Sequence, residues 1–208
     1  MKERPILFSA PMVRAILAGA KTQTRRVAKP IKHPDLGNVY SPGALVLEHE
    51  PRHVIERACP YGQPGDRLWV REAFDFMPDQ SPDNPAGCQI VYWATGSYQN
   101  RTAPSDYNPM IYGREKIRPS IHMPRWASRI TLEITGVRVE RLQDISASDA
   151  LAEGVNVHVD HQSKPPTSIY SPVQAYRDLW GTINGLESWE ANPWVWVVKF
   201  KRVQGGAA

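Results

Sequence analysis

Alternation of apolar and polar residues along the chain predicts several β-strands. The clearest case is residues 129–142, RITLEITGVRVERL, where apolar residues take every second position before Gly136 and again after it. A period of two is typical of a strand with one buried face, and a glycine that interrupts it predicts a bulge or a bend. Similar patterns predict strands at 6–8, 67–72, 89–95 and 192–203. In the last of these, the pattern places one set of apolar side chains on a common face: Trp194, Trp196, Val198 and Phe200.

Three segments carry the start and stop signals of helices. In SAPMVRAILAG, Ser9 is a plausible N-cap, Pro11 falls in the first turn, and Gly19 suits the left-handed residue that ends a helix. A second helix is expected to begin at Ser146 or Ser148 and to end at Gly154. The third helix is expected to begin at Ser171-Pro172, with Gln174 completing a possible capping box. Its apolar face consists of Val173, Tyr176, Trp180 and Ile183.

The remaining stretches show weaker patterns. Residues 30–65 are interpreted as a loop with strand-like fragments, ALVLEHE and HVIERA, and residues 96–119 as irregular. Nineteen prolines and fourteen glycines favour loops between short strands over a helical bundle. We therefore expect an α+β fold in one domain, residues 1–203: a β-barrel with flanking helices and a large loop insertion. Residues 204–208 are expected to be a disordered tail.

Cysteine content and hydropathy indicate the cellular compartment in which the protein is expected. Cys59 and Cys88 lie far apart in sequence and outside any metal-type spacing, which argues against a disulfide scaffold. The apolar stretch at the N-terminus is too short for a signal peptide, and no segment approaches membrane-spanning length. We expect a cytoplasmic protein without a membrane partner.

The net charge of +4 is unevenly distributed. Residues 1–34 hold eight basic residues against the single acid Glu3, and a second basic stretch follows near residues 114–129. Such stretches suit a phosphate-bearing or nucleic-acid ligand, and they equally suit a solvated basic face.

Common catalytic motifs are missing from the sequence. It has no G-x-S-x-G, no phosphate-binding G-x-x-x-x-G-K-[ST] and no G-x-G-x-x-G. The one local cluster of metal-ligand types, His158, Asp160 and His161, lacks the helical spacing of a metal site and is interpreted as an exposed loop. His122 is interpreted as a packed or loop histidine. Neither a metal nor an organic cofactor is expected.

The stretch AGAKTQTRR, residues 18–26, offers a possible nucleophile and base. A threonine hydroxyl attacks a carbonyl only if a base takes its proton, and a lysine can be that base if burial and nearby positive charge lower its pKa. Lys21 and Thr24 are three residues apart, which on a straight strand would put them on opposite faces. A turn after Gly19 could bring them to one side.

The longer segment ILAGAKTQTRR is similar to the signature of the ASCH superfamily, whose RNA-related members share a PUA-like β-barrel and a G-x-K-x-x-E-x-R motif. Gly19, Lys21 and Arg26 fit the motif, while Thr24 stands where most members have glutamate. This departure resembles the branch of small YqfB-like N4-acetylcytidine amidohydrolases. The resemblance covers both ends of the barrel but not its middle, and residues 75–125 look like an insertion relative to the smallest enzymes of that branch.

The resemblance implies a catalytic set of lysine, threonine and glutamate. The segment TLEITGVRVERLQDISASDALAEGV matches the family spacing without gaps and places the glutamate on Glu153, with Glu72 as a rival. Without the resemblance, Glu153 reads as a solvated carboxylate at a helix end, and Glu72 as a residue paired with a neighbouring arginine. Arg26, Glu72 and Trp69 are the candidate substrate-binding residues. Trp69, Trp93 or Trp126 could stack on a pyrimidine or simply pack.

The activity that follows from the resemblance is hydrolysis of the N4-acyl amide of N4-acetylcytidine, or of a related N4-acylated cytosine nucleoside, to cytidine and a carboxylate. The main alternative is a non-catalytic RNA-binding module, with Lys21, Arg25 and Arg26 on phosphates. A binding module gains little from Thr24, whereas acyl transfer needs its hydroxyl. A nuclease has less support, because no histidine pair or acidic cluster for metal-dependent cleavage stands out.

Overall fold

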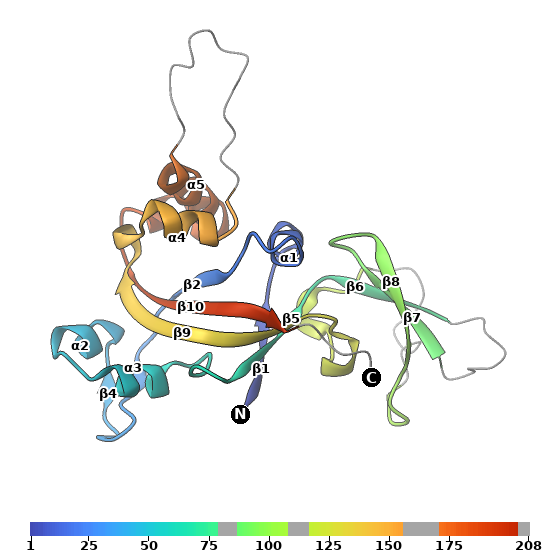
Figure 1. The fold of residues 1–208 in the computed structure, drawn as a ribbon, viewed down its shortest axis with the longest axis horizontal. Coiled ribbons are helices and arrows are strands. Elements are labelled where there is room, and N and C mark those ends of the chain that lie inside the picture. Colours follow the sequence, from blue (N-terminus) through green and yellow to red (C-terminus); the bar gives the residue numbers. More distant parts are fainter. Residues whose placement is uncertain (79–86, 108–116, 156–170, 204–208) are drawn as a thin grey trace, which may run out of the picture.

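The computed structural model describes residues 1–78, 87–107, 117–155 and 171–203 (Figure 1). The histidines at 158 and 161, Asp160 and the tail at 204–208 lie outside these ranges. In chain order, the strands are β1 Glu3–Leu7, β2 Gln23–Val27, β3 Ile31–Lys32, β4 Val39–Tyr40, β5 Arg67–Arg71, β6 Phe74–Pro78, β7 Gly87–Tyr92, β8 Ser97–Thr102, β9 Thr131–Arg141 and β10 Trp194–Val203. The α-helices are α1 Ala10–Leu17, α2 Pro42–Leu47, α3 Arg52–Ala58, α4 Ala147–Ala152 and α5 Pro172–Asn184. Short 3₁₀ turns lie at Ser120–His122, Arg125–Ala127, Leu142–Asp144 and Leu186–Ser188.

A five-stranded sheet in the order β1-β5-β9-β10-β2 forms the centre of the fold. β1 and β5 run parallel, and the other neighbours run antiparallel. The predicted irregularity near Gly136 is confirmed: Gly136 pairs with Lys199 and Ile134 with Phe200, so Thr135 is the extra residue of a bulge. Bulges increase the local bend and twist of a strand. The long strands β9 and β10 are visibly curved in Figure 1.

The predicted α+β class is confirmed, with the five-stranded sheet at the centre. Its two edge strands, β1 and β2, form no ladder with one another. They nevertheless approach, because the Arg26 guanidinium on β2 donates a hydrogen bond of 2.6 Å to the carbonyl of Leu7 at the end of β1. The result is a curled sheet whose two edge strands are bridged by a side chain.

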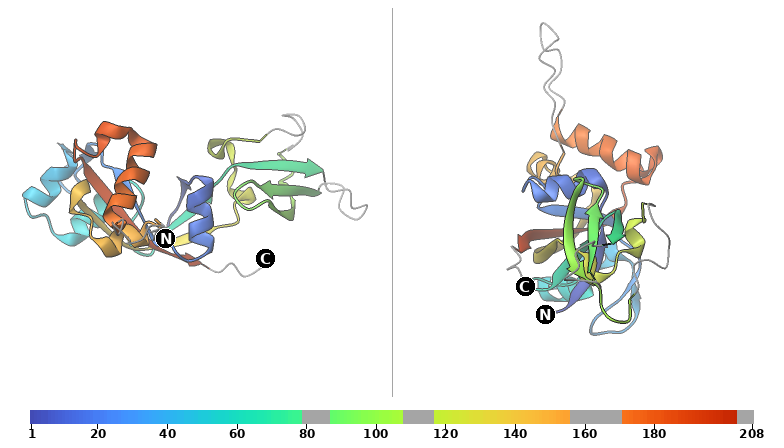
Figure 2. Two further views of the ribbon diagram at one scale, coloured as in Figure 1. Left: turned by 90° about the horizontal axis from the view of Figure 1, so that it is seen from above. Right: turned by 90° about the vertical axis from the view of Figure 1, so that its right-hand side faces the viewer.

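Two hydrophobic cores lie on opposite faces of β10, as its alternation predicts. Trp196, Val198 and Phe200 pack in a core that also contains residues of α1, α2, β1 and β5. Val195 and Val197 pack on the other side against residues of α4 and α5. Figures 1 and 2 show α4 and α5 covering this second face near β2 and β10.

Two stretches differ from the sequence-based expectation. ALVLEHE and HVIERA, expected to be strand-like, belong largely to the helices α2 and α3. Each helix follows or begins with a proline, whose fixed φ suits a first turn, and short apolar runs do not distinguish a helix from a strand. In addition, the expected loop insertion contains the antiparallel sheet β6-β7-β8.

The β6-β7-β8 sheet has its own small core, built around Phe74, Phe76, Ile90, Tyr92 and Met123. It projects to one side of the main sheet (Figure 2). β8 escaped prediction because its residues, SYQNRT, are polar throughout and largely exposed at an edge. No helix in the described part of the chain is long and apolar enough to cross a membrane.

Candidate functional site

The turn after α1 places Lys21 against the end of α4. Gly19 has a φ of +76°, the left-handed conformation that glycine adopts readily. Lys21 then forms an isolated antiparallel bridge with Glu153, and the next amide, of Thr22, donates a hydrogen bond of 2.8 Å to the carbonyl of Ala152. These backbone contacts join two segments that are 132 residues apart.

Lys21 and Glu153 form a buried ion pair. The Lys21 ammonium donates to Glu153 Oε2 at 2.8 Å and to the Glu153 backbone carbonyl at 2.9 Å, and both side chains are almost completely buried. Burial is the main influence on the Lys21 amine and lowers its pKa from the ordinary value of 10.5. The charge of Glu153 opposes this shift, whereas the positive charges of Arg26 and Arg25 lower the pKa further.

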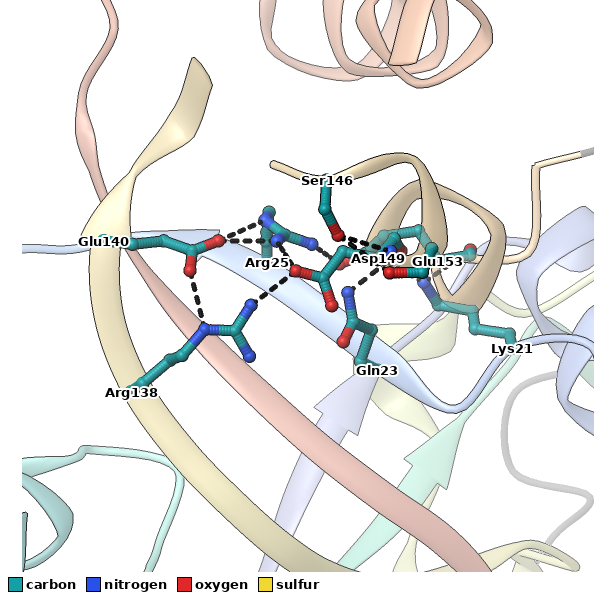
Figure 3. A network of polar contacts seen from close by, with 9 residues as sticks. Lys21, Gln23, Arg25, Arg138, Glu140, Ser146, Asp149 and Glu153 are labelled. Carbon is teal, nitrogen blue, oxygen red and sulfur yellow. Dashed lines mark hydrogen bonds and ion pairs between the residues drawn. The ribbon is translucent and has the colours of Figure 1, made fainter. Parts of the chain in front are cut away.

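Glu153 is also bound by Arg25, whose side chain is fully buried. Arg25 Nη1 donates to Glu153 Oε1 at 3.0 Å, so each carboxylate oxygen of Glu153 faces a different cation. The other nitrogens of Arg25 donate to Glu140 on β9 and to Asp149 on α4. Arg138 closes this charge network by donating to the same two carboxylates at 2.6 and 2.7 Å (Figure 3).

The charge network contains three cations and three carboxylates, namely Lys21, Arg25 and Arg138 with Glu140, Asp149 and Glu153. Buried charges are tolerated when they are paired and hydrogen-bonded, and removing one partner is costly. The network therefore holds Glu153 in one orientation.

Helix α4 carries Asp149 and has Glu153 as its C-cap, and local signals fix the position of this helix. The Ser146 hydroxyl accepts a hydrogen bond of 3.1 Å from the Asp149 amide, which confirms Ser146 as the N-cap. Gly154 ends the helix with a φ of +82°. Gln23, at the start of β2, donates to the Asp149 carbonyl at 2.9 Å and ties the helix to the sheet.

A cavity of about 150 Å³ lies between β2, α1 and α5, next to the charge network. Thr24, Arg25, Arg26 and Glu153 contribute its polar lining. The other lining residues are mainly aromatic or aliphatic: Met12, Val27, Tyr61, Tyr176, Leu179, Trp180, Ile183 and Asn184.

Thr24 and Glu153 thus line the same cavity, and Lys21 lies behind Glu153 rather than in the lining. Thr24 pairs with Val198 of β10, so its side chain lies on the sheet face opposite that of Arg25. Lys21 Nζ is 5.7 Å from the ring centre of Phe8, and the Arg26 guanidinium is 5.4 Å from the same centre. Within the described residues, Lys21 bonds to Glu153 and makes no hydrogen bond to Thr24.

The three candidate substrate-binding residues have different positions. Arg26 lines the cavity. Glu72 and Trp69 do not: the Glu72 carboxylate is buried in a two-bond pair with Arg129, at 2.8 and 2.9 Å, and Trp69 on β5 lies under the Arg71 guanidinium at 4.7 Å. The arrangement of Glu72 matches the alternative in which it pairs with an arginine.

Sequence reasoning missed several residues of the site. Nothing in the local pattern of QTRRV indicates that Arg25 is buried or that Glu140 and Asp149 face it. The sequence pattern indicates Tyr176 only as part of an apolar helix face, although a tyrosine there also carries a hydroxyl group. Among the described residues, no group of three or more His, Cys, Asp and Glu side chains could hold a metal ion.

Comparison with protein-family models, with curated proteins and with solved structures found no match to this chain. The geometry of the site and the resemblance of the Lys21 segment to the ASCH signature are therefore the observations that bear on function.

Proposed function

We propose that this protein is an amidohydrolase of the ASCH type, with a PUA-like barrel, that hydrolyses the N4-acyl amide of N4-acetylcytidine or a related N4-acylated cytosine nucleoside. The observation that carries the proposal is the buried Lys21–Glu153 ion pair directly behind the wall of a cavity lined by Thr24. A lysine, a carboxylate and a hydroxyl within one small site are the groups that acyl transfer requires.

The size and lining of the cavity suit one pyrimidine ring. An engineered protein cavity of about 150 Å³ binds benzene, so the present cavity has room for a single six-membered ring but not for a whole nucleoside. Tyr61, Tyr176 and Trp180 supply aromatic walls for such a ring. In this arrangement the base occupies the cavity and the ribose extends toward its mouth.

In the proposed mechanism, the Thr24 oxygen attacks the acyl carbon of the amide. The hydroxyl proton passes to the Lys21 amine, directly after a rotation of the lysine side chain or through Glu153, which contacts Lys21 and also lines the cavity. The bond from carbon to N4 then breaks, and the same proton goes to the leaving cytosine. Water hydrolyses the Thr24 ester in the same way and releases the carboxylate. If Lys21 activates water instead, that water takes the place of Thr24 in the first step.

The electrostatics of the site support a base at Lys21. Burial and the charges of Arg25 and Arg26 lower its pKa, which increases the fraction of Lys21 that is neutral at a given pH. Arg26 lines the cavity and can bind either the developing oxyanion or the ring carbonyl of cytosine. A well-placed donor of this kind contributes about 3 kcal/mol to transition-state stabilisation.

The RNA-binding alternative uses Lys21, Arg25 and Arg26 as phosphate ligands. The side chains of Lys21 and Arg25 are fully buried and bonded to carboxylates. Phosphate contacts would require breaking these ion pairs, so the arrangement favours the hydrolase. A steep loss of RNA affinity with added salt would support the alternative.

The proposal is tested by the hydrolysis of N4-acetylcytidine by Thr24→Ala and Thr24→Ser. We expect Thr24→Ala to lose activity and Thr24→Ser to keep part of it, because serine retains a hydroxyl. Full activity of Thr24→Ala would remove Thr24 as the nucleophile and would favour water activated by Lys21.

A further inference from the structure

Tyr176 is held rigidly at the wall of the cavity. It lies one turn into α5, whose start is fixed by a complete capping box: the Ser171 hydroxyl accepts from the Gln174 amide, and the Gln174 side chain accepts from the Ser171 amide. The Tyr176 ring packs against Trp180 and Trp189, with ring centres 6.1 and 6.4 Å away. Only 3% of the residue is exposed.

The Tyr176 hydroxyl has no hydrogen-bond partner within the part of the chain that the structure describes, although the residue lines the cavity. This hydroxyl oxygen is not one of the buried side-chain atoms that lack a partner, so it keeps accessible surface although the residue as a whole is almost completely buried. Among the described residues, the other deeply buried tyrosine is Tyr92, whose hydroxyl instead donates to the Ala127 carbonyl at 3.0 Å. The Tyr176 hydroxyl is therefore open to the cavity that the residue lines, where an acceptor atom can bond to it.

Two donors of the lining residues, Arg26 Nε and Trp180 Nε1, have no partner among the described residues and almost no accessible surface. The Tyr176 hydroxyl is, in contrast, a donor that the acceptor atom of a ligand in the cavity can reach. Burial, foremost, raises the pKa of the Tyr176 phenol, and the nearby charge of Glu153 raises it further, so this hydroxyl keeps its proton and can donate.

We propose that the Tyr176 hydroxyl donates a hydrogen bond to a carbonyl oxygen of the N4-acylcytosine bound in the cavity, which makes Tyr176 a substrate-binding residue. This inference depends on the proposed function for the class of ligand. An N4-acylcytosine has two carbonyl oxygens, one on the ring and one on the acyl group. Cytidine keeps only the ring carbonyl, so binding of cytidine distinguishes the two.

The test compares Tyr176→Phe with Tyr92→Phe, which removes the same atom from a buried tyrosine elsewhere. For each protein, the melting temperature, the kcat/KM for N4-acetylcytidine and the calorimetric affinity for cytidine are measured. We expect Tyr176→Phe to melt at or above the wild-type temperature, because its hydroxyl has no partner to lose. Its kcat/KM should fall about 10- to 100-fold. Tyr92→Phe should melt at a lower temperature and keep the wild-type kcat/KM.

The outcomes separate this inference from the proposed function. If the wild type cleaves N4-acetylcytidine and Tyr176→Phe cleaves it equally well, the inference is overturned and the function stands. If the wild type binds cytidine in a Tyr176-dependent manner without cleaving the amide, the inference stands and the function is overturned. A wild type that neither binds nor cleaves overturns both. Reduced cytidine binding by Tyr176→Phe assigns the hydrogen bond to the ring carbonyl, and unchanged binding with reduced kcat/KM assigns it to the acyl carbonyl.

Discussion

Replacing Glu153 by glutamine keeps the shape of the side chain and removes the carboxylate that Lys21 and Arg25 share. Arg25 retains Glu140 and Asp149, but Lys21 loses its only carboxylate partner among the described residues. Removing one member of a buried ion pair typically destabilises a protein by about 3–5 kcal/mol. We expect a loss in this range for Glu153→Gln at pH 7.

The pH dependence of this loss follows from Lys21. An unpaired buried lysine can escape by losing its proton, which from its ordinary pKa of 10.5 costs about 5 kcal/mol at pH 7 and about 2 kcal/mol at pH 9. In the variant, the folded-state pKa of Lys21 lies further below the unfolded-state pKa than it does in the wild type. At pH values between these two pKa values, the unfolded chain binds more protons than the folded protein. Stability must then rise with pH in that interval. The penalty of Glu153→Gln should therefore shrink from pH 7 to pH 9.

Urea unfolding of the wild type and the variant at both pH values measures the penalty. The matched control is Glu133→Gln, which removes the carboxylate of a largely exposed pair with Lys201. Exposed ion pairs contribute little to the free energy of unfolding, so this control should lose at most about 0.5 kcal/mol of stability. Its loss should be the same at pH 7 and pH 9. A penalty for Glu153→Gln that is equal at both pH values, or no larger than that of the control, would show that Glu153 does not stabilise a buried, charged Lys21.

Two further predictions concern the supports of the charge network. Arg25→Lys replaces a fork that binds three carboxylates with a single ammonium, so we expect a loss of about 2–3 kcal/mol in urea unfolding and at least about a tenfold fall in activity. Arg138→Lys, in a partly exposed position, should lose less stability, and equal losses would contradict this account. Gly154→Ala must adopt a φ of +82° and place a Cβ 3.0 Å from Lys21 Cβ, so we expect a loss of about 2 kcal/mol and reduced activity. Gly96→Ala, with a φ of +69° and open space around it, should cost about 1 kcal/mol and leave activity unchanged; a similar result for both would show that the contact with Lys21 is unimportant.

Local signals in the sequence predicted local structure well. The Ser171–Gln174 capping box, the left-handed glycines after α1 and α4, and the alternation of β10 all depend on residues within a few positions of one another, and the structure has each of them. The polar edge strand β8 lacked such a signal, and the short apolar runs of α2 and α3 do not distinguish a helix from a strand. Their conformations depend on neighbours that are distant in sequence.

The contacts within the candidate site join residues that are far apart in the sequence. Lys21 meets Glu153 because β2 pairs with β10 and α4 packs beside it, and no local pattern encodes that contact. The family spacing selected Glu153, whereas the residues alone left Glu72 open. The basic pair Arg25–Arg26 suggested phosphate binding, yet Arg25 is buried by carboxylates from β9 and α4. A charge in the sequence does not reveal whether its partner is a ligand or another part of the chain.

The decisive measurement for amidohydrolase activity is the ultraviolet spectrum of N4-acetylcytidine, followed over time with the wild-type protein. We expect conversion to the spectrum of cytidine with release of one equivalent of acetate. An unchanged spectrum, both with this compound and with a bulkier N4-acyl analogue, would contradict the assignment of amidohydrolase activity to the Thr24–Glu153 cavity.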